Sequence, residues 1–192
     1  LAPTSGVFFS FPDSAWDRSP DCTRLVNGFA LCELQQPDAG EYWTADDGAT
    51  TPYRGQGVRI PTLDEVLTAF PQMKYNIEIK QIEPSIASSL CEALRAHDLT
   101  DRALIASFHP TAMNEFRAAC PEVATSMVED EIRPFFILNT IFLGALYNPP
   151  GAAFHVPEYS GSLPVLTPRF VRGAHGNNVA LHPSTSPLST LP

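Results

Sequence analysis

Hydrophobic and polar positions change period several times along the second half of the chain. Apolar and polar residues alternate in short runs typical of strands, and between these runs apolar residues recur at helical spacing. The pattern predicts five strands, over 75–80, 103–108, 123–127, 153–156 and 179–182. It predicts helices over 84–97, 110–119, 130–147 and 168–175. Strand starts 20 to 30 residues apart fit parallel strands joined by helical crossovers, either in an open doubly wound sheet or in part of a barrel.

A further helix is predicted before the first strand. Thr62 and Glu65 have the spacing of a capping box, in which each side chain bonds a backbone N–H at the helix start. Apolar residues then follow at helical spacing until Pro71 ends the run. The rest of the first 70 residues is rich in proline and other loop-forming residues, so we expect mostly irregular structure there.

Composition narrows the class of protein. The 192 residues carry a net charge of −9, and the basic residues are scattered singly, so nucleic acid is not expected as a partner. Apolar residues make up 44% of the chain, enough for a sizeable core. The length falls short of the roughly 250 residues typical of a complete eight-fold βα barrel. No signal peptide or membrane span is visible, so we expect a soluble protein, with a slight preference for the cytoplasm over secretion.

The four cysteines stand far apart. Cys22, Cys32, Cys91 and Cys120 form no Cys-x-x-Cys pair, which argues against a zinc ribbon or a thioredoxin-type redox motif. A chain of this size does not need disulfides as staples. We expect reduced, partly buried thiols.

One predicted strand carries chemistry. Asn76, Glu78 and Lys80 alternate with apolar residues and so share one face of the strand over 75–80. In a parallel barrel the other face packs on helices, so this polar row would point inward, with Lys80 at the catalytic carboxyl end. Glu78 would supply an oxygen ligand for Mg²⁺ or Ca²⁺, and Lys80 would neutralise a phosphate oxygen. The alternative is a half-exposed edge strand with a solvated glutamate and lysine.

Histidines offer weaker candidates. His109 follows the strand over 103–108 and is a candidate for a catalytic face, although a residue before Pro110 also shapes the loop. His97 is interpreted as structural at a helix end. The remaining histidines, at 155, 175 and 182, show no metal-ligand spacing.

Several motifs together resemble the glycerophosphodiester phosphodiesterase family. The strings Tyr53-Arg-Gly-Gln-Gly-Val-Arg-Ile-Pro-Thr-Leu-Asp-Glu-Val-Leu67, Asn76-Ile-Glu-Ile-Lys80 and Ile105-Ala-Ser-Phe108 are similar to that family in order and spacing. The similarity continues through Glu129-Asp-Glu-Ile-Arg133, Val156-Pro-Glu158 and Pro168-Arg-Phe-Val. It starts near Asp13, in Asp13-Ser-Ala-Trp-Asp17-Arg18, and extends to His182.

The resemblance implies a fold and an activity. The implied fold is α/β, a TIM-like (β/α) barrel that is incomplete, with an unassigned segment over 1–12, the barrel domain over 13–182 and a disordered tail over 183–192. The implied activity is metal-assisted hydrolysis of a small-molecule glycerophosphodiester to glycerol 3-phosphate and an alcohol. Glu78 matches the family's metal-ligand glutamate, and Lys80 matches the lysine that ends the same motif.

The chain also departs from the family pattern. No His-Arg-Gly or Glu-x-Asp motif precedes Asp13, Pro12 stands where the family has its second histidine, and no Trp-Thr-x-Asn motif follows His182. Both family proton carriers are thus absent, so we expect a truncated, frame-shifted or decayed member with little turnover. An incomplete barrel would also expose strand edges through which copies self-associate.

Two other functions stay open. One is a catalytically inactive phospho-ligand or protein-binding module on the same fold. The other is a neighbouring barrel phosphodiesterase, phospholipase C-like or sphingomyelinase D-like.

Overall fold

A computed structural model describes residues 38–41 and 43–184. The expectations for Pro12, Asp13, Asp17, Arg18, Cys22 and Cys32 therefore lie outside the described residues. The chain divides into two compact units, Leu1–Met73 and Lys74–Pro192.

The described helix of the first unit, α2 (Leu63–Ala69), starts at the expected capping box. The Thr62 hydroxyl accepts from the Glu65 N–H at 3.1 Å, and the Glu65 carboxylate accepts from the Thr62 N–H at 2.8 Å. The bonds that the Thr62 N–H and hydroxyl donate to the Glu65 carboxylate favour its charged form and lower the pKa of Glu65. The prediction of this helix is confirmed.

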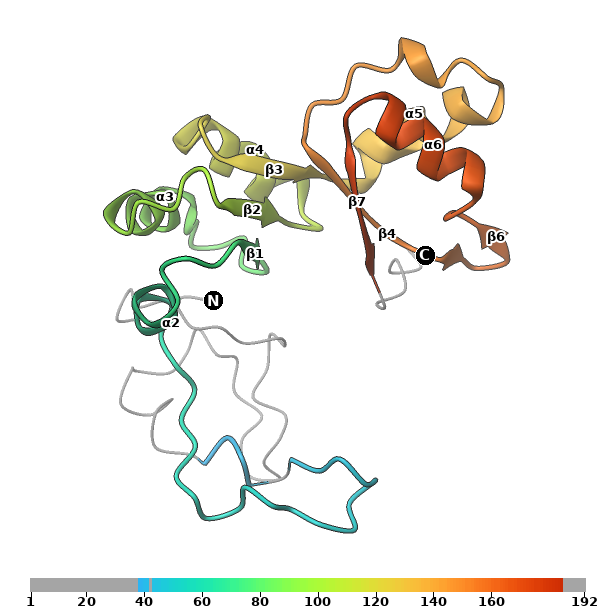
Figure 1. The fold of residues 1–192 in the computed structure, drawn as a ribbon. Coiled ribbons are helices and arrows are strands. Elements are labelled where there is room, and N and C mark those ends of the chain that lie inside the picture. The colour runs from blue at the N-terminus through green and yellow to red at the C-terminus, as the bar shows by residue number, and fades with distance from the viewer. Residues whose placement is uncertain (1–37, 42, 185–192) are drawn as a thin grey trace. The chain divides into compact units, whose positions relative to one another are not determined.

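The second unit is built on five parallel strands (Figure 1). In spatial order they are β1 (Tyr75–Glu78), β2 (Ala103–Ala106), β3 (Ala124–Met127), β4 (Ala153–Pro157) and β7 (Ala180–Ser184). All five predicted strands are confirmed, with ends within two residues of those expected. The last strand runs through Pro183 and Ser184, which had been assigned to the tail, and pairs there with Val156 and Pro157. The remainder of the expected tail, over 185–192, lies outside the described residues.

The order of these strands distinguishes the two expected fold types. Each long strand lies beside the next one in the sequence, as in a βα barrel, whereas a doubly wound sheet reverses its order at a switch point. Only the short hairpin β5 (Tyr159–Ser160) and β6 (Leu163–Pro164), which the sequence pattern did not predict, interrupts the series. The described strands thus form part of a barrel, as the sequence predicted.

Four α-helices follow strands in this unit: α3 (Ala87–Ala96), α4 (Pro110–Ala119), α5 (Glu129–Thr140) and α6 (Pro168–Gly176). The bounds of α4 and α6 are close to those predicted. The predicted start at 84 is wrong, because Ile86 is the N-cap and the helix begins only at Ala87. The predicted end at 147 is also wrong, because Phe142 takes a positive φ of 67° that ends the α-helical geometry. A short 3₁₀ helix, η2 (Gly144–Leu146), follows.

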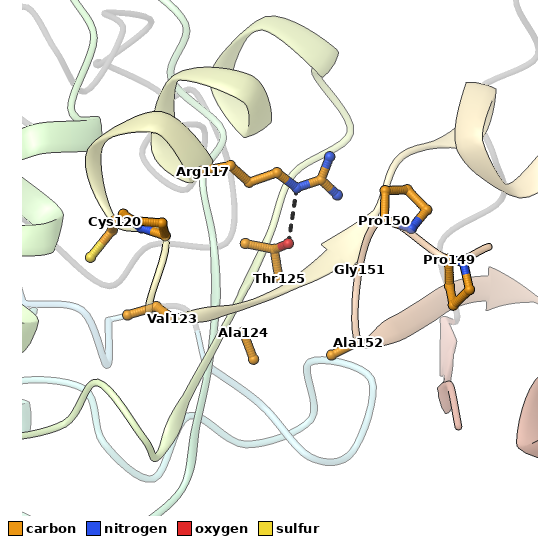
Figure 2. A pocket seen from close by; sticks show the side chains of 10 residues that line it. Arg117, Cys120, Val123, Ala124, Thr125, Pro149, Pro150, Gly151 and Ala152 are labelled. Carbon is orange, nitrogen blue, oxygen red and sulfur yellow. Dashed lines mark hydrogen bonds between the residues drawn. The ribbon is translucent and has the colours of Figure 1, made fainter. Parts of the chain in front are cut away.

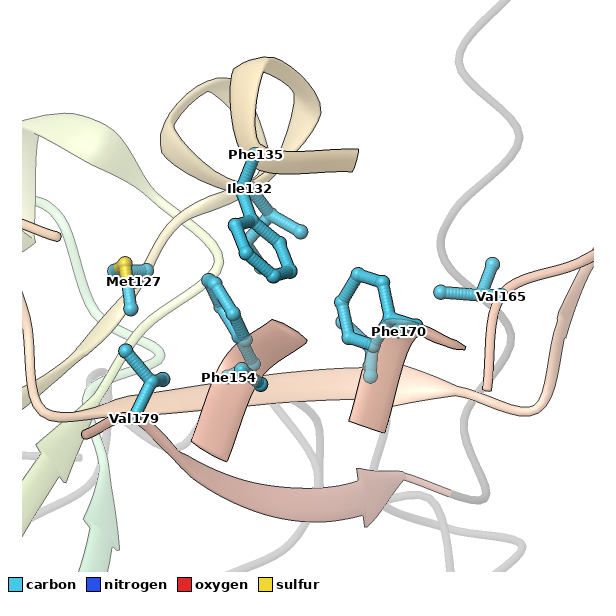
Figure 3. Packing of buried hydrophobic residues seen from close by; sticks show 9 residues of the cluster. Met127, Ile132, Phe135, Phe154, Val165, Phe170 and Val179 are labelled. Carbon is cyan, nitrogen blue, oxygen red and sulfur yellow. The ribbon is translucent and has the colours of Figure 1, made fainter. Parts of the chain in front are cut away.

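Aromatic side chains fill the core between α5, α6 and the strands (Figure 3). The rings of Phe135, Phe154 and Phe170 lie 4.8 to 5.5 Å apart, centroid to centroid, and all three are fully buried. Such tilted aromatic contacts add to the free energy gained from apolar burial. Because Met127, Phe154 and Val156 belong to this cluster, one face of β3 and β4 is covered by α5 and α6.

Two of the cysteines form a disulfide, contrary to the expectation of reduced thiols. Cys91 in α3 and Cys120, which ends α4, form a disulfide with a Cα–Cα distance of 5.7 Å. Both residues are buried. The expectation of reduced thiols is therefore wrong for this pair, because successive crossover helices lie side by side and bring together residues 29 positions apart.

No helix in the described part of the chain is long and apolar enough to cross a lipid bilayer.

Candidate functional site

The polar row of the first strand lies on the face opposite the helix-facing apolar residues. Tyr75 and Ile77 are half-buried and Ile79 is buried, whereas Asn76 and Glu78 are exposed. Lys80 is half-buried, and its Nζ lies 3.5 Å from Glu78 Oε1. A carboxylate and an ammonium group thus lie together at the carboxyl end of β1, on the face that a barrel turns inward. The predicted alternation is confirmed; the roles of these two residues are not tested by it.

The end of β1 is fixed by its neighbour. The Ile79 N–H donates to Ala106 O at 2.7 Å, so the ladder continues past the last residue of the strand. The buried Ser107 hydroxyl donates to Ile79 O at 2.7 Å. These bonds hold the backbone on either side of Glu78 and Lys80, although neither side chain contributes to them.

The register of the sheet brings two further histidines to the same face. Glu78 pairs with Ala106, Leu104 with Ala124 and Ser126 with Ala153, so these residues share one face across the first four strands. Two residues further along their strands lie Lys80 and His155, which therefore share a layer near the carboxyl ends. His182 of β7 is the register partner of His155.

His155 and His182 form a stacked pair. Their ring centroids are 5.0 Å apart, with 25° between the planes. The Nε2 atom of His155 is buried and has no hydrogen-bond partner. Burial, and secondarily the proximity of His182, lowers the pKa of His155 and favours its neutral form. A neutral imidazole with an unpaired ring nitrogen is a competent proton acceptor or ligand.

The sequence interpretation passed over this pair, because spacing along one chain does not reveal which residues meet across two parallel strands. Alternation alone places each histidine on a face, but the register that makes them partners requires the sheet.

His109, the weaker catalytic candidate, has a structural role. It precedes Pro110 at the start of α4 in extended conformation, and its N–H donates to the Ser107 hydroxyl at 3.1 Å. Its imidazole forms no hydrogen bond or ion pair with any residue the structure describes. The structure therefore shows His109 shaping the loop after β2, and its catalytic role stays a prediction.

The described residues supply few ligands for a metal ion. Cys91, Cys120 and Glu122 are the only described group of three donor side chains within mutual reach. The disulfide occupies both sulfur atoms, so this group does not fit a metal. Glu78 provides a hard oxygen ligand suited to Mg²⁺ or Ca²⁺, but a single carboxylate does not complete such a site. Among the described residues, Glu78 is therefore the one carboxylate that we assign to a metal ion.

A groove of about 460 Å³ lies at the amino ends of the strands (Figure 2). Thr125, Gly151 and Ala152 line it at the amino ends of β3 and β4, the end opposite to Lys80. The Arg117 guanidinium at its edge is already engaged, because it bonds both Glu131 carboxylate oxygens, Thr125 Oγ1 and Ser126 O. We assign this groove no part in the candidate chemistry.

Solved structures share the fold. A glycerophosphodiester phosphodiesterase from Agrobacterium tumefaciens superposes with a TM-score of 0.66 at 14% identity, covering 94% of this chain and 69% of that one. An Oleispira antarctica phosphodiesterase, solved with the product sn-glycerol-3-phosphate, superposes with a TM-score of 0.62 at 21% identity, covering 96% and 70%. These likenesses support the TIM-like barrel class, of which the described strands form part.

Sequence relatives cover most of the chain. A glycerophosphodiester phosphodiesterase of Bacillus altitudinis is 25% identical over 90% of this chain and 66% of its own length. A Mycobacterium tuberculosis protein, "Probable glycerophosphodiester phosphodiesterase 2", is 31% identical over 67% of this chain and 49% of its own length. The chain thus spans between about half and two thirds of these relatives.

The family pattern itself extends over nearly the whole sequence. The Glycerophosphoryl diester phosphodiesterase family matches residues 5–187, which include the polar strand with Glu78 and Lys80 and the two strands that carry His155 and His182. The chain belongs to the glycerophosphoryl diester phosphodiesterase family.

Proposed function

We propose that this chain carries part of the active site of a phosphoric diester hydrolase, which converts a glycerophosphodiester and water to glycerol 3-phosphate and an alcohol. The observation that carries the proposal is the family match over the strand where Glu78 and Lys80 lie together at the carboxyl end. A relative of the same fold was solved with sn-glycerol-3-phosphate, which supports this product class.

Each residue of the polar strand has a distinct role in the proposal. Glu78 would contribute one oxygen ligand to Mg²⁺ or Ca²⁺, and a bound divalent ion would offset negative charge on the phosphoryl oxygens. Lys80 would bind a phosphate oxygen as a point charge. Because Lys80 already lies 3.5 Å from Glu78, the pair holds its two charges in position before substrate arrives.

His155 and His182 are the candidates for proton transfer during hydrolysis. Hydrolysis breaks one P–O bond and forms another: the attacking water loses a proton and the departing alcohol gains one. His155 is the candidate acceptor because burial keeps its imidazole neutral and its Nε2 has no hydrogen-bond partner among the described residues, and His182 is its register partner on the same face. These histidines stand at positions other than those of the family's own histidines.

The cysteine pair bears on the compartment. A buried disulfide is maintained most readily in an oxidising environment. It therefore weighs against the slight preference for the cytoplasm, and we propose an oxidising compartment for the folded chain.

The test is hydrolysis of glycerophosphocholine by the purified chain with Mg²⁺ or Ca²⁺, followed as release of glycerol 3-phosphate. We expect a low rate that a chelator abolishes and that Glu78→Gln lowers by roughly 10²-fold or more, the loss typical of a charge-stabilising group. Glu92→Gln, an exposed carboxylate on helix α3, is the matched control and should leave the rate unchanged.

The alternatives give different results in the same assay. Phosphate binding without hydrolysis would favour the inactive binding module. Activity on intact phospholipid without activity on glycerophosphocholine would favour a phospholipase C-like or sphingomyelinase D-like enzyme. Hydrolysis that persists in Glu78→Gln would contradict the proposed role of this strand.

A further inference from the structure

Five large apolar side chains stand exposed on one short segment of the second unit. Ile137, Ile141, Phe142, Leu143 and Leu146, called here the apolar loop, are between 44% and 79% exposed, with Phe142 the most exposed. They lie at the end of α5 and in η2, away from the strand face that carries Glu78. Scattered exposed apolar residues are ordinary, but five of them lie within ten residues of the chain here, a concentration that suits an interaction surface.

Hydrogen bonds and close packing fix the backbone of the apolar loop. The Leu143 N–H donates to Leu138 O at 2.8 Å, and Asn177 Nδ2 of the segment after α6 donates to Gly144 O at 3.1 Å. A Cβ on Gly144 would lie 2.8 Å from Asn139 Oδ1, so the turn packs closely on α5. Phe142 adopts a positive φ of 67°, which is unfavourable for a bulky residue and is held by these contacts. The segment thus presents its apolar side chains in a defined conformation.

Charge is distributed unevenly around this surface. Residues 134–157 contain no Asp, Glu, Lys or Arg, and the only acidic residue after position 133 is Glu158. Arg169 and Arg172 are the only Lys or Arg residues after position 133. Residues 134–192 therefore have a net charge of +1, whereas residues 1–133 have a net charge of −10. The last third of an otherwise acidic chain thus carries two arginines and one acid, and one of these arginines, Arg169, lies against Phe142 of the apolar loop.

The arginines are available to an anionic partner. The Arg169 guanidinium lies over the Phe142 ring at 4.0 Å and donates to Thr140 O at 2.8 Å. Arg172 lies one turn further along α6 and is exposed. Neither forms an ion pair with the described residues. Surfaces that bind at the membrane–water interface typically combine cationic side chains with exposed Phe, Leu and Ile.

We propose that the apolar loop docks on an anionic lipid surface, with Phe142 and Leu146 inserted among the acyl chains and Arg169 and Arg172 at the headgroup phosphates. A second copy of the chain is the poorer occupant, because a symmetric contact would gather the arginines of both copies. Of the three acids at the start of α5, Glu131 already pairs with Arg117 and Glu129 with Arg133. The proposal rests on this surface alone and is independent of the hydrolase function.

Sedimentation of the full chain with vesicles tests the proposal. We expect binding to vesicles of phosphatidylcholine with phosphatidylglycerol, and weaker binding to phosphatidylcholine alone. The double variant Phe142→Ser and Leu146→Ser should lose binding by roughly tenfold or more, because two apolar anchors are removed. Arg169→Gln with Arg172→Gln should lower binding to the anionic vesicles by roughly tenfold and leave binding to the neutral vesicles unchanged.

The matched control is Tyr159→Ser with Leu163→Ser, an aromatic and an aliphatic residue that are also exposed, in the β5–β6 hairpin; this variant should bind as the parent does. Circular dichroism checks that each variant is folded, so that lost binding is not mistaken for misfolding. The proposal is overturned if the parent fails to sediment with anionic vesicles, or if the hairpin variant loses as much binding as the loop variant. It is equally overturned if light scattering finds a dimer that Phe142→Ser and Leu146→Ser dissociates without changing vesicle binding.

Discussion

His155 links the local environment of one side chain to the pH dependence of the whole chain. Burial and His182 lower its pKa in the folded state, whereas the unfolded residue titrates near its ordinary value of about 6.5. As pH falls below that value, the unfolded chain takes up a proton that folded His155 resists, so the free energy of unfolding should fall. Above it both states are neutral at this position and the effect vanishes. The other titratable group facing His155 from an adjacent described strand is His182, since β3 presents Ala124 and Ser126 on that face.

Denaturant unfolding between pH 7.5 and 5.5 measures this effect. His155→Gln should flatten the decline in stability across that range, because an amide does not titrate. His175→Gln, at an exposed position in α6, is the control and should keep the parental decline. An unchanged pH dependence in His155→Gln would show that burial of this ring does not shape the stability of the fold.

The sequence alone predicted one pair of residues in the candidate site and missed another pair. Alternation within one strand was enough to put Glu78 and Lys80 on a common face, because side-chain direction in a strand depends only on position. His155 and His182 are 27 residues apart and meet only through the register of β4 and β7. Cys91 and Cys120 were missed for the same reason, since their contact depends on how two helices pack.

The contact between α5 and α6 yields a prediction about helix packing. A Cβ on Gly173 would lie 2.2 Å from Asn139 Oδ1 and 3.2 Å from the Phe135 ring, so the two helices approach too closely there for any side chain. Gly173→Ala should lower the free energy of unfolding by about 1–3 kcal/mol, the usual cost of overpacking. Gly176→Ala, in the same helix but with nothing within 4 Å, should be neutral or stabilising by up to about 1 kcal/mol.

Chemical denaturation of both variants measures the difference between the two glycines. Equal effects would mean that helix propensity, and not close packing, decides the outcome. The existence of these helices follows from periodicity, but their ends do not: α3 begins only at Ala87, and Phe142 takes a positive φ two residues after α5 ends.

For the whole molecule, the spacing of strands left an open sheet and a barrel as alternatives. Both folds use parallel strands joined by helices, so the same hydrophobic pattern fits either. The consecutive spatial order of β1, β2, β3, β4 and β7 distinguishes them, and only pairing between strands reveals it. Among the described strands, β1 and β7 each have one edge without a partner strand. Because an unpaired edge can pair with another chain, self-association through these edges stays a proposal.

The Cys91–Cys120 disulfide should contribute to the stability of the whole second unit. Joining Cys91 to Cys120 closes a loop of 29 residues in the unfolded chain, and the loop-entropy model puts its contribution at about 3.5 kcal/mol. Cys91→Ala with Cys120→Ala should therefore unfold at a markedly lower denaturant concentration than the parent. Reductant added to the unfolded parent before refolding should lower its stability by a similar amount and leave the variant unchanged, although both retain Cys22 and Cys32. If parent and variant unfold at the same concentration, the packing of α3 against α4 is sufficient to hold this part of the barrel and the cross-link adds nothing.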